Sequence, residues 1–164
     1  MYQETFMRQA IALSAKALDT KGTEPFGAVV VQNGKIVGEG INRSLATFDP
    51  TSHGETEAIR DACKTLQTVD LRGCEIYTSC EPCALCVAAM AIAGITKMYY
   101  AANLSQSDAA LQNLPETNRF PIDVDHLRHE CGRPLSARKM PAQQALSAEA
   151  VEVLRAWAAQ QQNG

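Results

Sequence analysis

The segments TSHGE (residues 51–55) and SCEPCALC (residues 79–86) carry the strongest functional signal in the sequence. Together they offer one imidazole, from His53, and two thiolates, from Cys83 and Cys86. Zinc sites used for catalysis take three protein ligands of this kind and keep a fourth position for water. The two segments therefore predict one catalytic zinc site with these three ligands.

Glu55 follows the histidine by two residues and is left free for proton transfer. The pattern H-x-E…P-C-x-x-C is the signature of zinc-dependent nucleobase deaminases, in which the glutamate is the acid/base and not a ligand. Each half alone is a weak signal, because C-x-x-C also occurs as a redox pair and H-x-E arises by chance. A structural zinc would require a fourth protein ligand. The two halves together, with Pro82 before Cys83, favour the catalytic site.

Helical periodicity places both halves of the motif at helix starts. A helix is predicted to begin near His53, with Thr51 or Ser52 as its cap, because apolar residues recur at helical spacing at Ala58, Ile59, Ala62 and Leu66. Residues 75–78 predict a strand, after which Pro82 suits the first position of a second helix. Cys83 and Cys86 then share one face at that helix N-terminus, and Gly94 ends the helix.

The remaining elements indicate an α/β fold. The expected order is helix, hairpin, helix, strand, helix, strand. The hairpin is antiparallel, and the later strands alternate with helices, which implies parallel crossovers. Together they predict a three-layer α/β/α sandwich with a central mixed sheet. The expected elements are a helix over 2–19, strands over 26–31 and 35–41 joined by Asn33-Gly34, a loop carrying Asn42, and a strand over 97–102. Further on we expect a short helix over 108–114, a solvated basic loop containing Arg128, Arg133, Arg138 and Lys139, and a last helix capped by Ser147.

Composition suits a single domain over residues 1–164. Apolar residues make up 46% and charged residues 20%, and no apolar run is long enough to span a bilayer. No secretory signal is visible, so we expect a cytoplasmic protein whose four other cysteines are buried thiols. The formal net charge of −3 argues against a nucleic-acid partner, since binding phosphates requires a basic face.

The chain resembles the cytidine deaminase superfamily, and within it the bacterial guanine deaminases. The resemblance runs from the N-terminal helix to about Ala102. It includes the segments PFGA (25–28), EG (39–40) with Asn42, DPT (49–51), AIR (58–60), YTSCEPC (77–83) and YAA (100–102). It implies a zinc-dependent hydrolase that releases ammonia from a free nucleobase, most directly guanine to give xanthine. It also implies a homodimer, with the segment from about residue 103 open to exchange between subunits.

The resemblance also assigns substrate contacts. The residue matching Phe26 packs against the flat base and the one matching Asn42 hydrogen-bonds it, which suits an aromatic ring and an amide. Ala28 belongs to the same matching segment and is included among the substrate contacts. Guanine deaminases also hold the purine with an acidic residue after the fourth strand, and Asp108 is the nearest candidate in this sequence.

Three alternatives stay open. Gly54 stands where alanine is usual, and His-Gly-Glu resembles the fungal cytosine deaminases, so cytosine, a pterin or a triazine is an alternative substrate. A second alternative is the similar tRNA wobble adenosine deaminase, against which the acidic balance counts. A third is an inactive, zinc-stabilised binding protein, against which the presence of Glu55 counts.

Overall fold

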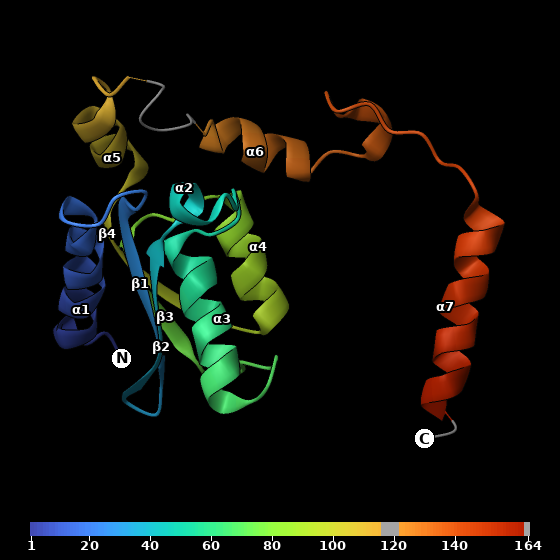
Figure 1. Cartoon of the computed structure of the whole chain (residues 1–164), viewed down its shortest axis with the longest axis horizontal. Coiled ribbons are helices and arrows are strands. Elements are labelled where there is room, and N and C mark those ends of the chain that lie inside the picture. Colours follow the sequence, from blue (N-terminus) through green and yellow to red (C-terminus); the bar gives the residue numbers. More distant parts are fainter. Residues whose placement is uncertain (116–121, 163–164) are drawn as a thin grey trace. The chain divides into compact units, whose positions relative to one another are not determined.

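Four strands form one mixed sheet in the spatial order β2-β1-β3-β4. Strand β1 pairs antiparallel with β2 and β3, and β3 pairs parallel with β4. The structure, a computed structural model, describes residues 1–115 and 122–162. The strands span Glu24–Gln32 (β1), Lys35–Asn42 (β2), Glu75–Cys80 (β3) and Lys97–Ala102 (β4), as Figure 1 shows.

The β1–β2 hairpin turns at Asn33 and Gly34, as predicted. Both residues have positive φ, 50° and 73°, which is the backbone that a two-residue type I′ turn needs. Strand β2 runs one residue further than expected, so Asn42 ends the strand and does not lie in a loop. It pairs with Glu24 across the hairpin, which fixes its place at the end of the sheet.

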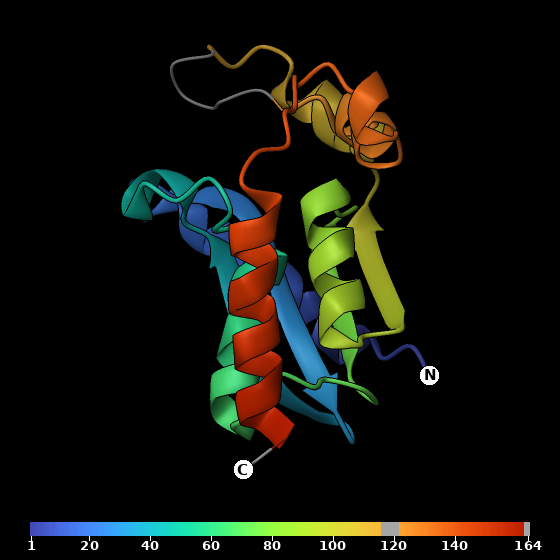
Figure 2. The ribbon, with the colours of Figure 1, turned by 90° about the vertical axis from the view of Figure 1, so that its right-hand side faces the viewer.

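Helices cover both faces of the sheet, which confirms the three-layer α/β/α prediction. Helix α1 (Glu4–Ala15) packs on one face, where Val29 and Val31 of β1 point. Helices α3 (Gly54–Leu66) and α4 (Ala84–Ala93) pack on the other, against Ala28 and Val30 (Figure 1). Alternate residues of β1 therefore serve two separate cores, as the two-residue period of a strand requires. Figure 2, turned by 90°, shows α4 running alongside the strands.

The predicted cap of the first motif helix and the predicted first residue of the second were wrong. His53 is the N-cap of α3, while the Ser52 hydroxyl donates to Glu57 Oε1 (3.0 Å) and the Thr51 hydroxyl to Asp49 Oδ1 (2.7 Å). Similarly, Pro82 precedes the second helix, which has Cys83 as its N-cap and begins at Ala84. The end of α4 is as expected, because Gly94 has φ +84°.

The region after β4 departs further from the sequence predictions. Helix α5 spans Leu104–Leu111 and not 108–114, because Asn103 and Gln106 form a capping box that starts it earlier. Helix α6 (Val124–Cys131) replaces the first part of the expected basic loop. A short helix that we did not predict, α2 (Ser44–Thr47), follows β2.

The chain divides into two units, Met1–Arg128 and His129–Gly164. The second unit contains the end of α6, a 3₁₀ turn at Leu135–Ala137 and helix α7. Helix α7 (Ser147–Gln162) was predicted, although Ser147 is its first residue and not its cap. Cys131 is exposed, contrary to the expectation of a buried thiol. Within the described residues, no helix has the length and apolarity of a membrane span. The single domain stays a prediction.

We predict that Gly40→Ala will destabilise the fold, because β2 and α3 are in backbone contact there. A Cβ atom at this position would lie 2.2 Å from the Gly54 carbonyl oxygen and 2.3 Å from the Ala58 nitrogen. Overpacking of this kind costs about 1–3 kcal/mol of unfolding free energy, measurable by urea denaturation. Gly34→Asn is the control, because its Cβ would meet nothing within 4 Å and asparagine tolerates positive φ. Equal losses in the two variants would contradict the proposed contact.

Candidate metal and active site

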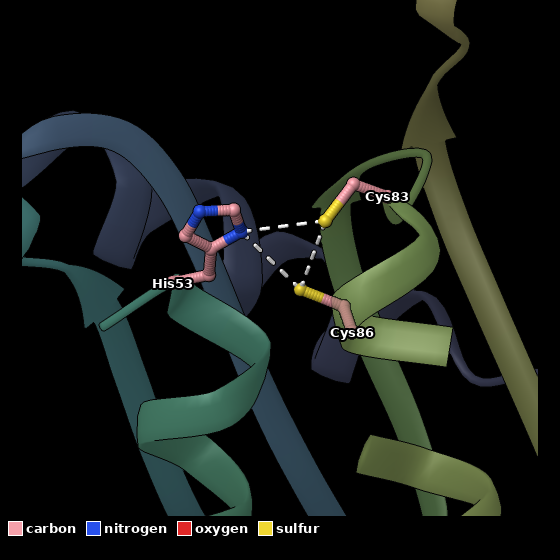
Figure 3. Close-up of side chains that lie close together, drawn as sticks. All are labelled: His53, Cys83 and Cys86. Atoms are coloured by element: carbon pink, nitrogen blue, oxygen red, sulfur yellow. Dashed lines mark hydrogen bonds between the residues drawn. The ribbon is translucent and has the colours of Figure 1, made fainter. Parts of the chain in front are cut away.

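Three potential metal ligands converge from two helix starts. His53 Nδ1 lies 3.5 Å from Cys83 Sγ and 3.4 Å from Cys86 Sγ, and the two sulfur atoms are 3.7 Å apart. Figure 3 shows all three side chains pointing toward one another. Ligands at ordinary zinc distances on a tetrahedron are separated by about 3.5–3.8 Å. The residues therefore fit a zinc ion, with one tetrahedral corner left for another ligand.

The local backbone explains why these side chains meet. His53 and Cys83 are both N-caps in extended conformation, with ψ of 159° and 173°, so each points off the end of its helix. Cys86 lies in the first turn of α4. The positive ends of the helix dipoles favour thiolate at this position. The His53 carbonyl is also held, by the Thr56 hydroxyl at 2.9 Å and the Glu57 N–H at 2.9 Å.

The cluster is already polarised without a metal. A hydrogen bond from the Cys86 thiol, together with His53, lowers the pKa of Cys83 to about 4. The same Cys83 sulfur raises the pKa of Cys86, with burial adding to the effect, and raises the pKa of His53. Near neutral pH Cys83 is therefore an ionised thiolate, while the proton of the Cys86 thiol must leave when a metal binds.

Glu55 lies beside the cluster but is not one of its three ligands. Its side chain is only 5% exposed, and burial raises the pKa of its carboxyl. Carboxylate oxygen Oε1 is 3.1 Å from the Thr78 hydroxyl, and Oε2 is 3.3 Å from Cys86 Sγ. A buried carboxyl with a raised pKa, next to a metal site, is suited to pass protons to and from a bound molecule.

A cavity of about 390 Å³ opens next to the cluster. Of the residues predicted as substrate contacts, Phe26, Asn42 and Asp108 line it, together with His53 and Glu55. Ala28 does not line the cavity: its side chain is fully buried in the core between the sheet and α3. The structure thus brings three of the four predicted substrate contacts to one space.

The hydrogen bonds of Asn42 define what it can offer to a ligand. Its Oδ1 accepts from the Ser44 N–H (3.0 Å) and from the Ser44 hydroxyl (2.8 Å). The side chain is 4% exposed and lines the cavity. Because the oxygen is engaged, the Nδ2 amide is the group of Asn42 that can donate to a ligand.

Sequence reasoning missed a second set of cavity residues, centred on Glu81. Its Oε1 accepts from Arg128 of α6 (3.0 Å) and its Oε2 from the Leu104 N–H of α5 (3.2 Å). The Arg128 guanidinium holds the pKa of the Glu81 carboxyl below its usual value. Other lining residues that were not predicted are Glu24, Phe48, Leu104, Ile122 and Val124. Only Glu81 had a usable signal, because it lies directly before Pro82 and Cys83.

Comparison with known proteins gives consistent matches. The family model "cytidine and deoxycytidylate deaminase zinc-binding region" matches residues 1–102. Guanine deaminase of Bacillus subtilis (strain 168) is 36% identical over 157 residues, covering 96% of this chain and 94% of the relative. The X-ray structure of guanine deaminase from Bacillus subtilis superposes with a TM-score of 0.81 at 34% identity, with the same shares covered. A tRNA-specific adenosine deaminase of Aquifex aeolicus is 37% identical over 102 residues, covering 62% of this chain and 67% of the relative.

We predict that Cys86→Ser will lower the zinc content of the purified protein from about one ion per chain to a small fraction of that. The substitution removes a thiolate that zinc requires. Metal analysis after dialysis measures the content. Cys131→Ser is the matched control, since that thiol is exposed and remote in sequence from the motif. Full zinc retention by Cys86→Ser would contradict the ligand set.

The raised pKa of His53 determines in which direction the metal affinity changes with pH. Because zinc needs the neutral imidazole, metal affinity is predicted to fall as pH drops below that raised pKa. A competing chelator titrated at several pH values would measure the change. An affinity independent of pH between about 5 and 8 would contradict His53 as a ligand.

Proposed function

The chain belongs to the cytidine and deoxycytidylate deaminase family, and from that premise we propose that it hydrolyses guanine to xanthine and ammonia. The observation that carries the reaction type is the buried, unligated Glu55 beside a three-ligand zinc cluster at the wall of a cavity. The choice of guanine is supported by the similarity to Bacillus subtilis guanine deaminase over almost the full length of both chains.

The mechanism assigns the proton transfers to Glu55. Zinc, when held by His53, Cys83 and Cys86, supplies the Lewis acidity that makes water a nucleophile near neutral pH. As the water attacks the amino-bearing ring carbon, Glu55 takes one of its protons and delivers it to the neighbouring ring nitrogen. Glu55 then passes a second proton to the amine, which leaves as ammonia. Guanine and water are thus converted to xanthine and ammonia.

The cavity walls are proposed to position the base. The ring of Phe26 packs on its face, and the Asn42 Nδ2 amide donates to an acceptor on its edge. Asp108 of α5 accepts from ring or amino N–H groups. Any contact made by Ala28 would have to use its backbone, because its methyl group lies in the core. Deamination of guanine would place the protein in purine metabolism, and its cytoplasmic location stays a prediction.

The charge of the cavity favours a free base over a polynucleotide. Among its described lining residues there are four carboxylates, Glu24, Glu55, Glu81 and Asp108, and no lysine or arginine. A phosphate group would meet repulsion there, and nucleic-acid binding requires basic side chains. The tRNA-specific adenosine deaminases of Aquifex aeolicus and Bacillus subtilis match 62% and 82% of this chain, a smaller share than the 96% matched by the guanine deaminase.

We predict that Glu55→Gln will keep its zinc and fold while losing roughly 10²–10⁴-fold in kcat, the usual contribution of a general acid/base. Ammonia release from guanine, cytosine, adenine, adenosine, an aminopterin and an aminotriazine would be measured with zinc-loaded protein. Glu39→Gln makes the same chemical change at an exposed site outside the cavity and serves as control. Undiminished activity in Glu55→Gln would refute the mechanism, and turnover of another ring but not guanine would refute the substrate.

We also propose a homodimer formed through α4. This helix, ALCVAAMAIA, contains no charged residue, yet Leu85, Val87 and Ile92 are 36%, 45% and 87% exposed. Next to it in the chain, the edge strand β4 exposes Met98 and Tyr100. A helix that is apolar all round is normally covered, and a second copy in a two-fold arrangement is the commonest cover. Exchange of the segment from about residue 103 stays a prediction.

Ile92→Lys is predicted to shift the protein from a two-chain to a one-chain mass, because it places a charge at the most exposed apolar side chain of α4. Light scattering coupled to gel filtration measures the mass. Val69→Lys is the control, since Val69 is 84% exposed but lies outside α4 and β4. A one-chain mass of the unmodified protein would rule out the dimer.

A further inference from the structure

The two oxygen atoms of the Glu55 carboxylate have different surroundings. Oε2 is 3.3 Å from Cys86 Sγ, which places it on the side of the metal ligands. Oε1 is 3.1 Å from the Thr78 hydroxyl, on the side of the sheet. Both residues are buried, with 5% of Glu55 and 1% of Thr78 exposed. The carboxylate is therefore held between the metal cluster and one hydroxyl.

Thr78 lies on β3, an interior strand that has a partner strand on each side. It pairs with Ala28 of β1 on one side and Tyr100 of β4 on the other. Its neighbours Ile76 and Tyr77 show how β3 alternates, since Ile76 packs in the core with α3 and α4, and Tyr77 in the core with α1. Thr78 shares the face of Ile76, and its hydroxyl therefore points toward α3 and Glu55.

The hydrogen-bonding capacity of the hydroxyl limits what it can do. A threonine hydroxyl has one proton to donate, and an ionised carboxylate can only accept. Two acceptors lie 3.1 Å from Thr78 Oγ1, namely Glu55 Oε1 and the Cys80 carbonyl oxygen. The Glu55 carboxylate also bonds to its own backbone N–H. The hydroxyl of Thr78 is therefore the contact to the Glu55 carboxylate that is made from the sheet.

We propose that Thr78 is the positioning residue of Glu55: its hydroxyl holds Oε1, so that Oε2 is the oxygen presented to the metal side for proton transfer. This inference rests on the proposed role of Glu55. The terminal torsion of a glutamate is broad, so the carboxylate plane is not fixed by the rotamer itself. Proton transfer needs the oxygen within hydrogen-bond reach and correctly aimed. A donor on a central strand provides that orientation.

Thr78→Val is the informative variant, because valine keeps the shape of the side chain and removes the hydroxyl. We expect kcat to fall roughly 10- to 100-fold, the rate equivalent of one hydrogen bond to a charged group. KM should stay within about threefold and zinc content should be unchanged, since Thr78 is neither a cavity-lining residue nor a proposed ligand. Thr78→Ser, which restores the hydroxyl, should recover most of kcat.

Tyr77→Phe is the matched control. It also deletes a hydroxyl on β3, which is hydrogen-bonded to the Gln3 N–H at 3.2 Å, but on the opposite face of the sheet. If Thr78 acted only by stabilising the strand, the two deletions would have similar effects on kcat. A normal kcat in Thr78→Val, loss of zinc from it, or no recovery in Thr78→Ser would each overturn the proposal.

A thermal double-mutant cycle tests the pair without using activity. Melting temperatures of the zinc-loaded protein, Thr78→Val, Glu55→Leu and the double variant give the coupling between the two side chains. A hydrogen-bonded pair should be non-additive by about 2–4 °C, and additive shifts would overturn the contact. Failure of the unmodified protein to turn over guanine would instead refute the proposed substrate. In that case kcat of the Thr78 and Tyr77 variants is measured with whichever base the protein does turn over. If it turns over none, the thermal cycle alone tests the contact.

Discussion

The structure depends on how closely the start of α3 approaches the sheet. A Cβ atom at Gly54 would lie 2.4 Å from the Phe26 carbonyl oxygen of β1, and one at Gly40 would lie 2.2 Å from the Gly54 carbonyl oxygen of α3. Backbone therefore meets backbone on both sides of the residue between His53 and Glu55. The same backbone contact fixes the positions of His53, Glu55 and Phe26 relative to one another, because the first two flank Gly54 and the third supplies the carbonyl that it meets. It also gives a physical reason for glycine where alanine is usual, since the methyl group of alanine has no space here.

The electrostatics of the site follow from that backbone contact. Bringing Cys83 and Cys86 together with His53, so that the three ligand atoms lie within 4.8 Å of one another, also places two thiols beside the Glu55 carboxylate, and these three acidic groups would repel one another if all were ionised. Without a metal, Cys83 is ionised and the raised pKa of Cys86 keeps the proton on the second thiol. A divalent cation stabilises the second thiolate, so metal binding and proton release are linked. Among the described residues, no buried side-chain nitrogen or oxygen lacks a hydrogen-bond partner, so the polar site is compatible with its burial.

The parts that could be predicted from sequence are those governed by local rules. The Asn33-Gly34 turn, the end of α4 at Gly94 and the order of elements up to Ala102, apart from the short helix α2, follow from backbone preference and periodicity. The caps were wrong because Thr51 and Ser52 use their hydroxyls on Asp49 and Glu57, which only the folded loop reveals.

Non-local contacts explain the other failures. Helix α6 is short and mostly polar. It is held by Val124, which packs on the core, and by Arg128, which pairs with Glu81, a residue 47 positions away in the sequence. In contrast, the start of α5 could have been predicted from the sequence, because Asn103 and Gln106 have the spacing of a capping box. The ligand set was recognisable because zinc demands residue types that few other patterns combine. The cavity wall carries no comparable chemical signature.

Glu81 joins the part of the cavity wall formed by α5 and α6 to the loop that carries the metal ligands. An ion pair as exposed as Glu81 with Arg128 contributes little by itself, since the two side chains are 24% and 41% exposed. However, Glu81 also accepts the Leu104 N–H at the start of α5, and Arg128 also reaches the Pro82 carbonyl oxygen (3.4 Å). These contacts lie within two residues of Cys83. The N-cap of α4, which is also a predicted metal ligand, is therefore two positions from Glu81, the residue that contacts α5 and α6. Cavity-lining residues on those helices, such as Asp108 and Val124, therefore stand on different elements from the metal ligands, whose geometry is set by α3 and α4.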